Sequence, residues 1–113
     1  MILVDKEISL EELKKIAHQS FGNLVKAVVD VEKEIMVIGG ELHSDEEEFL
    51  LRRGSQQENL WGINIYPDLE NKEWIEFDSV INLRPSLGNL TRGVDNPKIR
   101  EKICKIVNKL IRR

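Results

Sequence analysis

Two Val- and Ile-rich segments, residues 24–31 and 35–39, are separated only by residues 32–34, and this spacing constrains the fold most. A connection that short cannot cross over to a parallel neighbour, so the two segments must pair as an antiparallel hairpin. The first segment is apolar on both faces, which is typical of a strand at the centre of a sheet or of one covered by another subunit. The sequence therefore predicts an antiparallel sheet.

A second pair of strands is expected at residues 60–66 and 74–83, where apolar and polar residues alternate on either side of a turn-like segment, 67–73. Counted back from that turn, Tyr66 lies opposite Trp74. The alternation gives the pair two distinct faces. The face expected in the core carries Trp61, Ile63, Ile65, Ile75, Phe77, Ile81 and Leu83. The face expected outside carries Asn64, Tyr66, Trp74, Glu76, Asp78, Asn82 and Arg84.

Capping residues predict a helix near each end of the chain. Ser9 with Glu12 forms a capping box before an apolar stripe, and Gly22 is typical of the residue that ends a helix. Asn96 followed by Pro97 begins the last helix, because proline is well tolerated at the first helical position. Apolar residues then recur at helical spacing, which predicts one buried face.

A shorter helix is expected over residues 45–53, with Ser44 and Glu47 as its capping box. Residues 1–4 are expected to form a short edge strand. The predicted order is β-α-β-β-α-β-β-α in a single α+β domain over residues 1–113. We expect an antiparallel sheet of four to five strands with the helices mainly on one face, because hairpins rather than crossovers join the strands.

The chain has 113 residues, of which 41% are apolar and 33% charged, so it is long enough for one packed core and too apolar to be disordered. No apolar run approaches the length of a membrane span, and the first residues lack the pattern of a signal or transit peptide. We therefore expect no membrane partner and a cytoplasmic location.

The net charge of −3 hides an asymmetry along the chain. Residues 1–80 carry 8 Lys and Arg against 18 Asp and Glu, whereas residues 81–113 carry 9 against 2. Such a division is typical of a basic segment that meets an anionic partner. It is equally typical of two halves that attract each other, within one fold or across a dimer.

Several common functions find little support. The basic residues of the last helix have no interleaved aromatic residues, so nucleic acid is not expected as a partner. Cys104 is the only cysteine and falls near the apolar side of the same helix, where a free cysteine usually packs as a small apolar residue. His18 and His43 are the only histidines, so neither a metal site nor a cofactor is expected.

The loop over residues 84–93 is the first candidate site. Its candidate ligand-binding residues are Arg84, Ser86, Asn89, Thr91 and Arg92. Guanidinium forks, hydroxyls and backbone N–H groups before a helix suit a small anion such as a phosphate or a carboxylate. The alternative is a structural loop whose arginines pair with the acidic half of the chain. For Arg84 we favour the structural role.

A carboxylate pair and a histidine are the candidate catalytic residues. Glu76 and Asp78 stand two apart on a strand, so both point to one side, where Asn64 and Tyr66 lie opposite. Such a pair could bind Mg²⁺ or act as acid and base. His43 follows a Gly-Gly pair and could be a base. The alternatives are a solvated sheet face for the carboxylates and a strand-to-helix turn for the histidine.

Apolar and aromatic residues on the expected outer face indicate a contact surface. Val28, Tyr66 and Trp74 are the candidate interface residues. Exposed aromatic side chains on a sheet face often mark a contact with another protein. Because a chain of this size has few helices with which to cover both faces, we expect a homo-oligomer, with a homodimer favoured over a monomer.

Five phrases resemble a family of small uncharacterised prokaryotic proteins that is known only as a domain of unknown function. They are Val-Val-Asp-Val-Glu at 28–32, Gly-Gly-Glu-Leu-His-Ser-Asp at 39–45, Leu-Trp-Gly-Ile-Asn-Ile-Tyr-Pro at 60–67, Trp-Ile-Glu-Phe-Asp-Ser at 74–79 and Ile-Asn-Leu-Arg-Pro-Ser-Leu-Gly-Asn at 81–89. The likeness covers residues 24–110. It implies a bacterial or archaeal intracellular protein and supplies no activity. Leu87 and Leu90 replace the polar residues expected in such a loop.

We expect a non-catalytic binding or interaction module that acts as a homodimer. The alternative is an enzyme that acts on a small phosphorylated or carboxylated substrate through the loop and the carboxylate pair described above. Convergence of His43, Asp78 and Arg84 in the folded chain would favour the enzyme. A flat self-contact made by Tyr66 and Trp74 would favour the interaction module.

Overall fold

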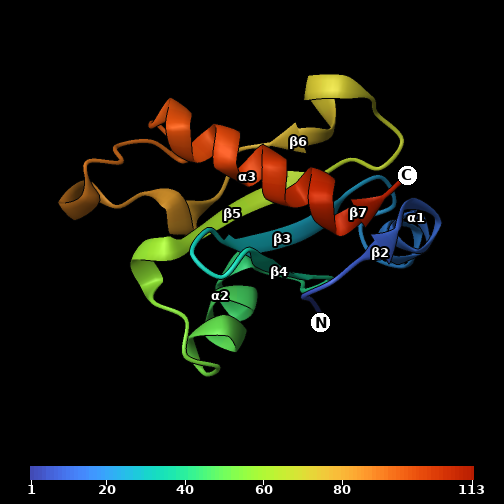
Figure 1. Cartoon of the computed structure of the whole chain (residues 1–113), viewed down its shortest axis with the longest axis horizontal. Helices are drawn as coiled ribbons and strands as arrows, with labels where there is room; N and C mark the ends of the chain where they lie inside the picture. Colours follow the sequence, from blue (N-terminus) through green and yellow to red (C-terminus); the bar gives the residue numbers. More distant parts are fainter.

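The computed structural model describes residues 1–113, apart from the side chain of Asn71. Its centre is a five-stranded sheet with the order β1-β4-β3-β5-β6, in which every neighbouring pair is antiparallel (Figure 1). The strands are β1 Ile2–Val4, β3 Val25–Asp30, β4 Ile35–Ile38, β5 Leu60–Ile65 and β6 Ile75–Glu76. The predicted α+β class, the edge strand at residues 1–4 and the hairpin of the Val- and Ile-rich segments are confirmed.

Three α-helices and four short 3₁₀ turns connect the strands. The helices are α1 Leu10–Gln19, α2 His43–Leu51 and α3 Pro97–Leu110. The turns are η1 Gln57–Asn59, η2 Asn71–Trp74, η3 Val80–Asn82 and η4 Pro85–Leu87. Ser9 Oγ accepts from Glu12 N over 3.1 Å and Asn96 Oδ1 accepts from Lys98 N over 2.9 Å, so both predicted N-caps are confirmed.

A small second sheet joins the two ends of the chain. β2 Ile8–Ser9 pairs in parallel with β7 Ile111–Arg112, immediately before α1 and immediately after α3. Ile8 and Ile111 are both buried in the larger core. The two helices are therefore tied together at one end of the molecule.

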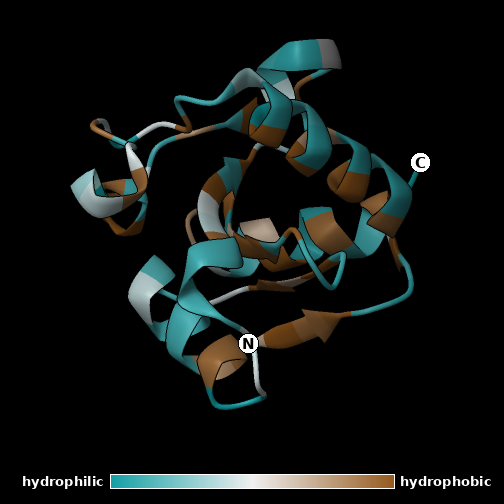
Figure 2. Cartoon of the chain, turned by 60° about the vertical axis from the view of Figure 1, so that its left-hand side comes forward, coloured by the Kyte–Doolittle hydropathy of each residue, from teal (hydrophilic) through white to brown (hydrophobic). Residues whose placement is uncertain are grey.

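Helices cover both faces of the sheet, but unequally. α1 and α3 pack on one face around the larger core, which includes Leu13, Ala17, Ile103, Ile106 and Leu110. α2 alone lies on the other face, over a small core of Val28, Val37, Leu50 and Leu60. In Figure 1 α3 and α2 lie on opposite sides of the strands, and in Figure 2 the strands are mostly brown while the helices alternate between brown and teal. The helices thus lie mainly on one face of the sheet, as predicted, with α2 alone on the other.

The strand predicted over residues 74–83 ends after two residues, at Glu76. Its pairing is as predicted, with Asn64 opposite Glu76. Beyond that pair the chain leaves the sheet because the side chain of Asn82 replaces a strand: it donates to Gly62 O over 2.9 Å and accepts from Gly62 N over 2.8 Å. Consequently Ile81 packs in the small core, and Leu83, expected inside, is exposed.

The expected contact face is also different. Trp74 is only 3% exposed and packs in the larger core, because it lies in a 3₁₀ turn where strand alternation does not apply. Val28 is fully buried because α2 covers it. Tyr66 is half-buried at the end of β5. The prediction that Val28 and Trp74 lie on an exposed surface is therefore wrong.

Candidate functional site

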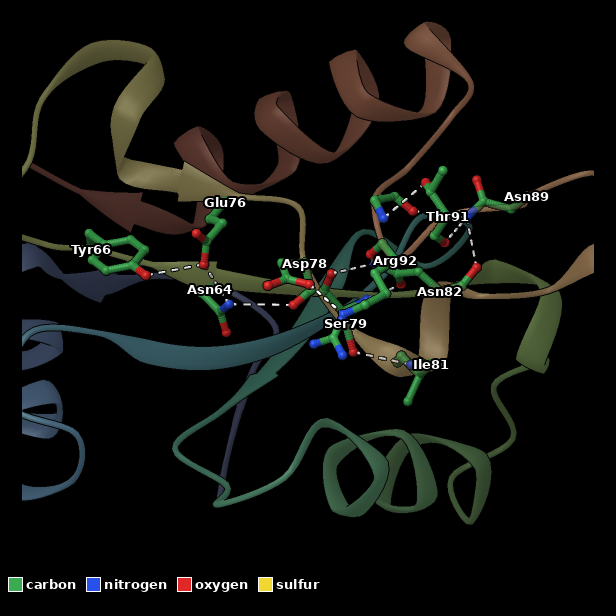
Figure 3. Close-up of polar contacts among 12 residues, drawn as sticks. Asn64, Tyr66, Glu76, Asp78, Ser79, Ile81, Asn82, Asn89, Thr91 and Arg92 are labelled. Carbon is green, nitrogen blue, oxygen red and sulfur yellow. Dashed lines mark hydrogen bonds and ion pairs between the residues drawn. The ribbon is translucent and has the colours of Figure 1, made fainter.

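A row of polar side chains crosses three neighbouring strands on the face that α2 covers. Lys26 of β3 stands opposite Asn64 of β5, which stands opposite Glu76 of β6. Directly opposed residues of antiparallel strands point to the same face, and Val28, two residues from Lys26, lies beneath α2. Asn64 Nδ2 donates to Glu76 Oε1 over 2.8 Å, and Tyr66 Oη donates to the same oxygen over 3.1 Å (Figure 3). We call Lys26, Asn64 and Glu76 the polar row.

The amide oxygen of Asn64 has no hydrogen-bond partner among the described residues. Asn64 is only 7% exposed, and its oxygen points away from the β5–β6 hairpin toward the side on which α2 lies (Figure 3). Leaving a buried acceptor unpaired costs about 1–3 kcal/mol. Two other buried side-chain atoms are unpaired among the described residues, Glu46 Oε1 and Trp61 Nε1. A buried acceptor of this kind takes a hydrogen bond from a group outside the protein side chains, either an ordered water or a bound molecule.

His43, the first residue of α2, lies over the polar row. Its Nε2 is 2.7 Å from the carbonyl oxygen of Ile63. A carbonyl can only accept, so Nε2 carries the proton and Nδ1 is left as an acceptor. Burial lowers the pKa of His43 below its ordinary value, and therefore the ring is neutral at pH 7. The charged groups that act on it are Lys26, Asp78 and Arg92.

The contact of His43 also explains where α2 begins. The predicted capping box at Ser44 is not formed: the helix starts at His43, its N-cap residue is Leu42, and no side chain caps it. Since the imidazole already anchors this end to β5, the helix needs no local capping side chain. The predicted range of residues 45–53 is accordingly shifted toward the N-terminus by two residues.

Glu46, one turn further along α2, is fully buried. Its Oε2 accepts from Gly40 N over 3.0 Å, while burial raises its pKa to about 9, so the carboxyl group is protonated at pH 7. A Cβ on Gly40 would lie 2.7 Å from Glu46 Cγ, which explains why glycine is needed there. Glu46 escaped notice in the sequence because it belongs to a run of acids typical of a solvated helix. The adjacent Gly-Gly pair was the available signal.

Asp78 and Arg92 flank the polar row. Arg92 Nε donates to Asp78 Oδ1 over 2.7 Å, and both side chains are about half exposed. The backbone oxygen of Asp78 lies 3.4 Å from Asn64 Nδ2. Both members of the proposed carboxylate pair are thus engaged, Glu76 by Asn64 and Tyr66 and Asp78 by Arg92. Among the described residues no group of three or more His, Cys, Asp or Glu is arranged to hold a metal ion.

Arg84 forms its hydrogen bonds and its ion pair with residues outside this cluster. Its guanidinium donates to the carbonyl oxygens of Ile81, Gln57 and Leu60. It also pairs with Glu47 over 3.4 Å, lies 5.0 Å from the ring centroid of Trp61, and its side chain is only 9% exposed. The guanidinium of Arg84 therefore donates its hydrogen bonds to other residues of the chain. The convergence of His43, Asp78 and Arg84 that would favour an enzyme is not found: the charge of Asp78 acts on His43, but the arginine that acts on it is Arg92 and not Arg84.

The other candidate ligand-binding residues of the loop are in different surroundings. Buried Asn89 donates to the carbonyl oxygens of Asn82, Thr91 and Gly93 and accepts from Asp95 N (Figure 3 shows Asn82, Asn89 and Thr91 gathered at one end of the view). Thr91 Oγ1 donates to Asp95 Oδ1. Ser86 is exposed on η4. Arg92 is the candidate of this loop whose side chain pairs with a residue next to the polar row, Asp78.

A wide groove of about 1320 Å³ lies elsewhere, between α3 and the segment that leads into β6. Trp74, Phe77, Cys104 and Arg100 contribute to its wall. Burial raises the pKa of the Cys104 thiol, which keeps it protonated and unreactive. The groove contains none of the unpaired buried atoms of the described residues, so volume alone does not make it the candidate site.

The fold and the site define a small α+β protein with a polar cluster set into the less covered face of an antiparallel sheet. The chain belongs to the family described as protein of unknown function (DUF5674), whose sequence profile matches residues 2–110. The resemblance of the five phrases to a family known only as a domain of unknown function is confirmed. No curated protein and no solved structure matches the chain. No helix in the described part of the chain has the length and apolar character needed to cross a membrane.

Proposed function

We propose that this protein is a binding module for a small polar molecule, which it holds against the polar row beneath His43. The observation that carries the proposal is the unpaired oxygen of Asn64, because a ligand that donates a hydrogen bond there removes the cost of leaving it buried and unpaired. His43 Nδ1 is a second acceptor on the same face. A hydroxyl or an amino group of the ligand fits these two acceptors.

The chain supports this site rigidly, as a binding site requires. Asn64 is held through its Nδ2 by Glu76, and His43 is held through its Nε2 by Ile63. Each side chain thus uses one polar atom for its own orientation and keeps the other for a ligand. Neither atom needs to break an existing hydrogen bond when a ligand binds.

A thermal-shift screen against divalent metals, nucleotides and sugar phosphates tests the proposal, because a ligand of the native state raises the melting temperature. Asn64→Leu removes the acceptor and keeps nearly the same side-chain volume. Ser86→Ala is the matched control, since Ser86 is exposed and outside the cluster. We expect a compound that stabilises the wild type and Ser86→Ala but not Asn64→Leu. Equal stabilisation of all three proteins would refute the proposed site.

The arrangement of His43 favours an enzyme as the second candidate function. A neutral imidazole whose tautomer is fixed by a backbone carbonyl is suited to accept a proton from a bound hydroxyl. His43→Gln retains a donor toward Ile63 but cannot act as a base. Binding that survives in this variant together with loss of turnover would support catalysis on a phosphorylated or carboxylated substrate. Unchanged turnover would rule out His43 as the base.

We further propose that two copies associate in the cytoplasm through the segment 80–90 rather than through Val28 and Trp74. Four of its apolar side chains are exposed, at 64% for Val80, 49% for Leu83, 48% for Leu87 and 67% for Leu90. The opposite charges of residues 1–80 and 81–113 favour association with a second copy. Light scattering tests this: the wild type should form dimers and a Leu87→Ser, Leu90→Ser double variant monomers. A monomeric wild type would contradict it.

A further inference from the structure

We infer that the ligand of this site carries an oxyanion, a carboxylate or a phosphate, that binds Lys26 next to the hydroxyl or amino group accepted by Asn64. The inference rests on the proposed binding function and adds the chemical class of the ligand. In this inference Lys26 takes the anion-binding role that the sequence analysis expected of the loop residues Arg84 and Arg92. Neither composition nor motifs had pointed to Lys26.

Lys26 is a half-buried cation whose charge is not matched by the chain. Its Nζ lies 5.4 Å from the ring centroid of Phe21, and among the described residues it forms no ion pair. The other half-buried lysine, Lys14, forms one with Asp68 over 3.5 Å. A lysine held partly out of water without a carboxylate leaves its ammonium group available to a bound anion.

The remaining cations near the loop are already occupied. Arg84 is enclosed by three carbonyl oxygens and Glu47, and Arg92 is paired with Asp78. An anion at either place would have to displace an existing partner. Lys26, whose Nζ lies near the Phe21 ring, has no charged partner among the described residues for an anion to displace.

The acidic groups around Lys26 do not cancel its charge. Glu46 is protonated at pH 7 because it is buried, and Asp78 is neutralised by Arg92. Glu76 accepts hydrogen bonds from Asn64 and Tyr66 and stands two strands away from Lys26. The row therefore presents a cation at one end and an acceptor at its centre.

Lys26 and Asn64 stand directly opposite each other on neighbouring strands, whose backbones lie about 4.8 Å apart. A small molecule that carries an oxyanion and, a few carbon atoms away, a hydroxyl or amino group suits a cation and an acceptor placed on adjacent strands. Hydroxy acids, amino acids and phosphorylated short alcohols have this form.

Calorimetric titration with three related probes tests the inference: glycerol 3-phosphate, glycerate and neutral glycerol. Lys26→Met removes the charge and keeps the apolar stem, and Lys102→Met, on the exposed side of α3, is the matched control. We expect glycerol 3-phosphate or glycerate to bind the wild type and Lys102→Met alike, about tenfold more tightly than Lys26→Met. Glycerol should bind more weakly than the anions and be indifferent to Lys26→Met. The preferred anion tells a phosphate site from a carboxylate site.

Two results would overturn the inference. One is equal affinity of Lys26→Met and the wild type for the anions. The other is failure of both anions to bind the wild type more tightly than about 10 mM. The Asn64→Leu variant keeps the two proposals apart. If glycerol binding is lost in Asn64→Leu while Lys26→Met has no effect on any probe, the binding site stands and only the oxyanion is wrong. If Asn64→Leu binds every probe like the wild type, the proposed site itself is wrong.

Discussion

The Nε2 atom of His43 donates to the carbonyl oxygen of Ile63 over 2.7 Å, and this one contact joins the start of α2 to strand β5, the neighbour of the central strand β3. It fixes the tautomer of the ring, since a carbonyl cannot donate. It also holds the ring where burial disfavours its charged form. The same hydrogen bond therefore couples the folding of α2 to the protonation state of a candidate functional group.

Replacing His43 by glutamine should reduce the pH dependence of stability in the acid range. The pKa of His43 is lowered in the folded state, so between that value and about 6.5 the unfolded chain binds more protons, and wild-type stability falls as the pH drops through this range. Glutamine does not titrate and can still donate to Ile63. Urea unfolding at pH 5, 6 and 7 should give a shallower decline for His43→Gln. His18→Gln, on the exposed side of α1, is the control, and an unchanged slope in His43→Gln would contradict the prediction.

Glu46→Gln should have the opposite effect, at alkaline pH. The pKa of Glu46 is raised from 4.5 to about 9, so the folded state binds more protons over this range and wild-type stability falls as the pH rises through it. Glutamine is neutral at every pH and can still accept from Gly40. At pH 9 the variant should be more stable than the wild type by at least about 1 kcal/mol, measured by urea unfolding. Glu41→Gln, an exposed neighbour, should show no such gain. A variant less stable than the wild type at pH 9 would contradict a protonated Glu46.

Arg84→Ala should destabilise the protein in the absence of any ligand. The change leaves the carbonyl oxygens of Leu60 and Gln57 without their donor and Glu47 without its partner. The expected loss is about 1–3 kcal/mol in the free energy of unfolding, read from chemical denaturation. Ser86→Ala should stay within about 0.5 kcal/mol of the wild type, because Ser86 is exposed on the same loop. An Arg84→Ala protein that unfolds together with the wild type would show that the guanidinium is not structural.

Asn82→Ala should also destabilise the protein, and Asn82→Asp should do so at least as much. The Asn82 side chain makes both a donor and an acceptor bond with Gly62 and donates to Arg92 O as well. Alanine removes these bonds at an expected cost of about 1–3 kcal/mol. Aspartate restores the acceptor but sets a negative charge against two carbonyl oxygens. Denaturant unfolding of the two variants checks the order, and an Asp variant more stable than the Ala variant would reverse it.

The parts of the fold that depend on neighbours in sequence were predictable. The caps at Ser9 and Asn96 follow from residues two or three positions apart, and the pairing of Asn64 with Glu76 follows from counting back along both strands from the turn between them. The end of β6 was not predictable, because it is set by Asn82 reaching across to Gly62, 20 residues away. The burial of Trp74 has a similar origin, since the larger core that encloses it is completed by α3.

The residues of the candidate site were likewise predictable only in part. His43, Asn64, Tyr66, Glu76 and Asp78 were suggested by residue type and strand parity, and the structure gathers them on one face. Arg84 and Asn89 have the residue types of ligand-binding groups, yet their donors go to backbone oxygens that no local pattern reveals. Lys26 could not be distinguished from other lysines, because what sets it apart, half-burial beside the polar row without an ion pair, depends on neighbours in space.

The pairing of β2 with β7 has a consequence for the order in which the chain can fold during synthesis. All five strands of the central sheet and the first two helices lie in residues 1–76, whereas α3 and β7, which complete the larger core on the same face as α1, lie in residues 97–112. A nascent chain on the ribosome therefore exposes the apolar side of β3, β4 and β5 until that stretch has emerged. Since the contacts that close it join opposite ends of the sequence, they form late and slowly. During this interval, molecular chaperones that bind exposed apolar strands can bind the nascent chain.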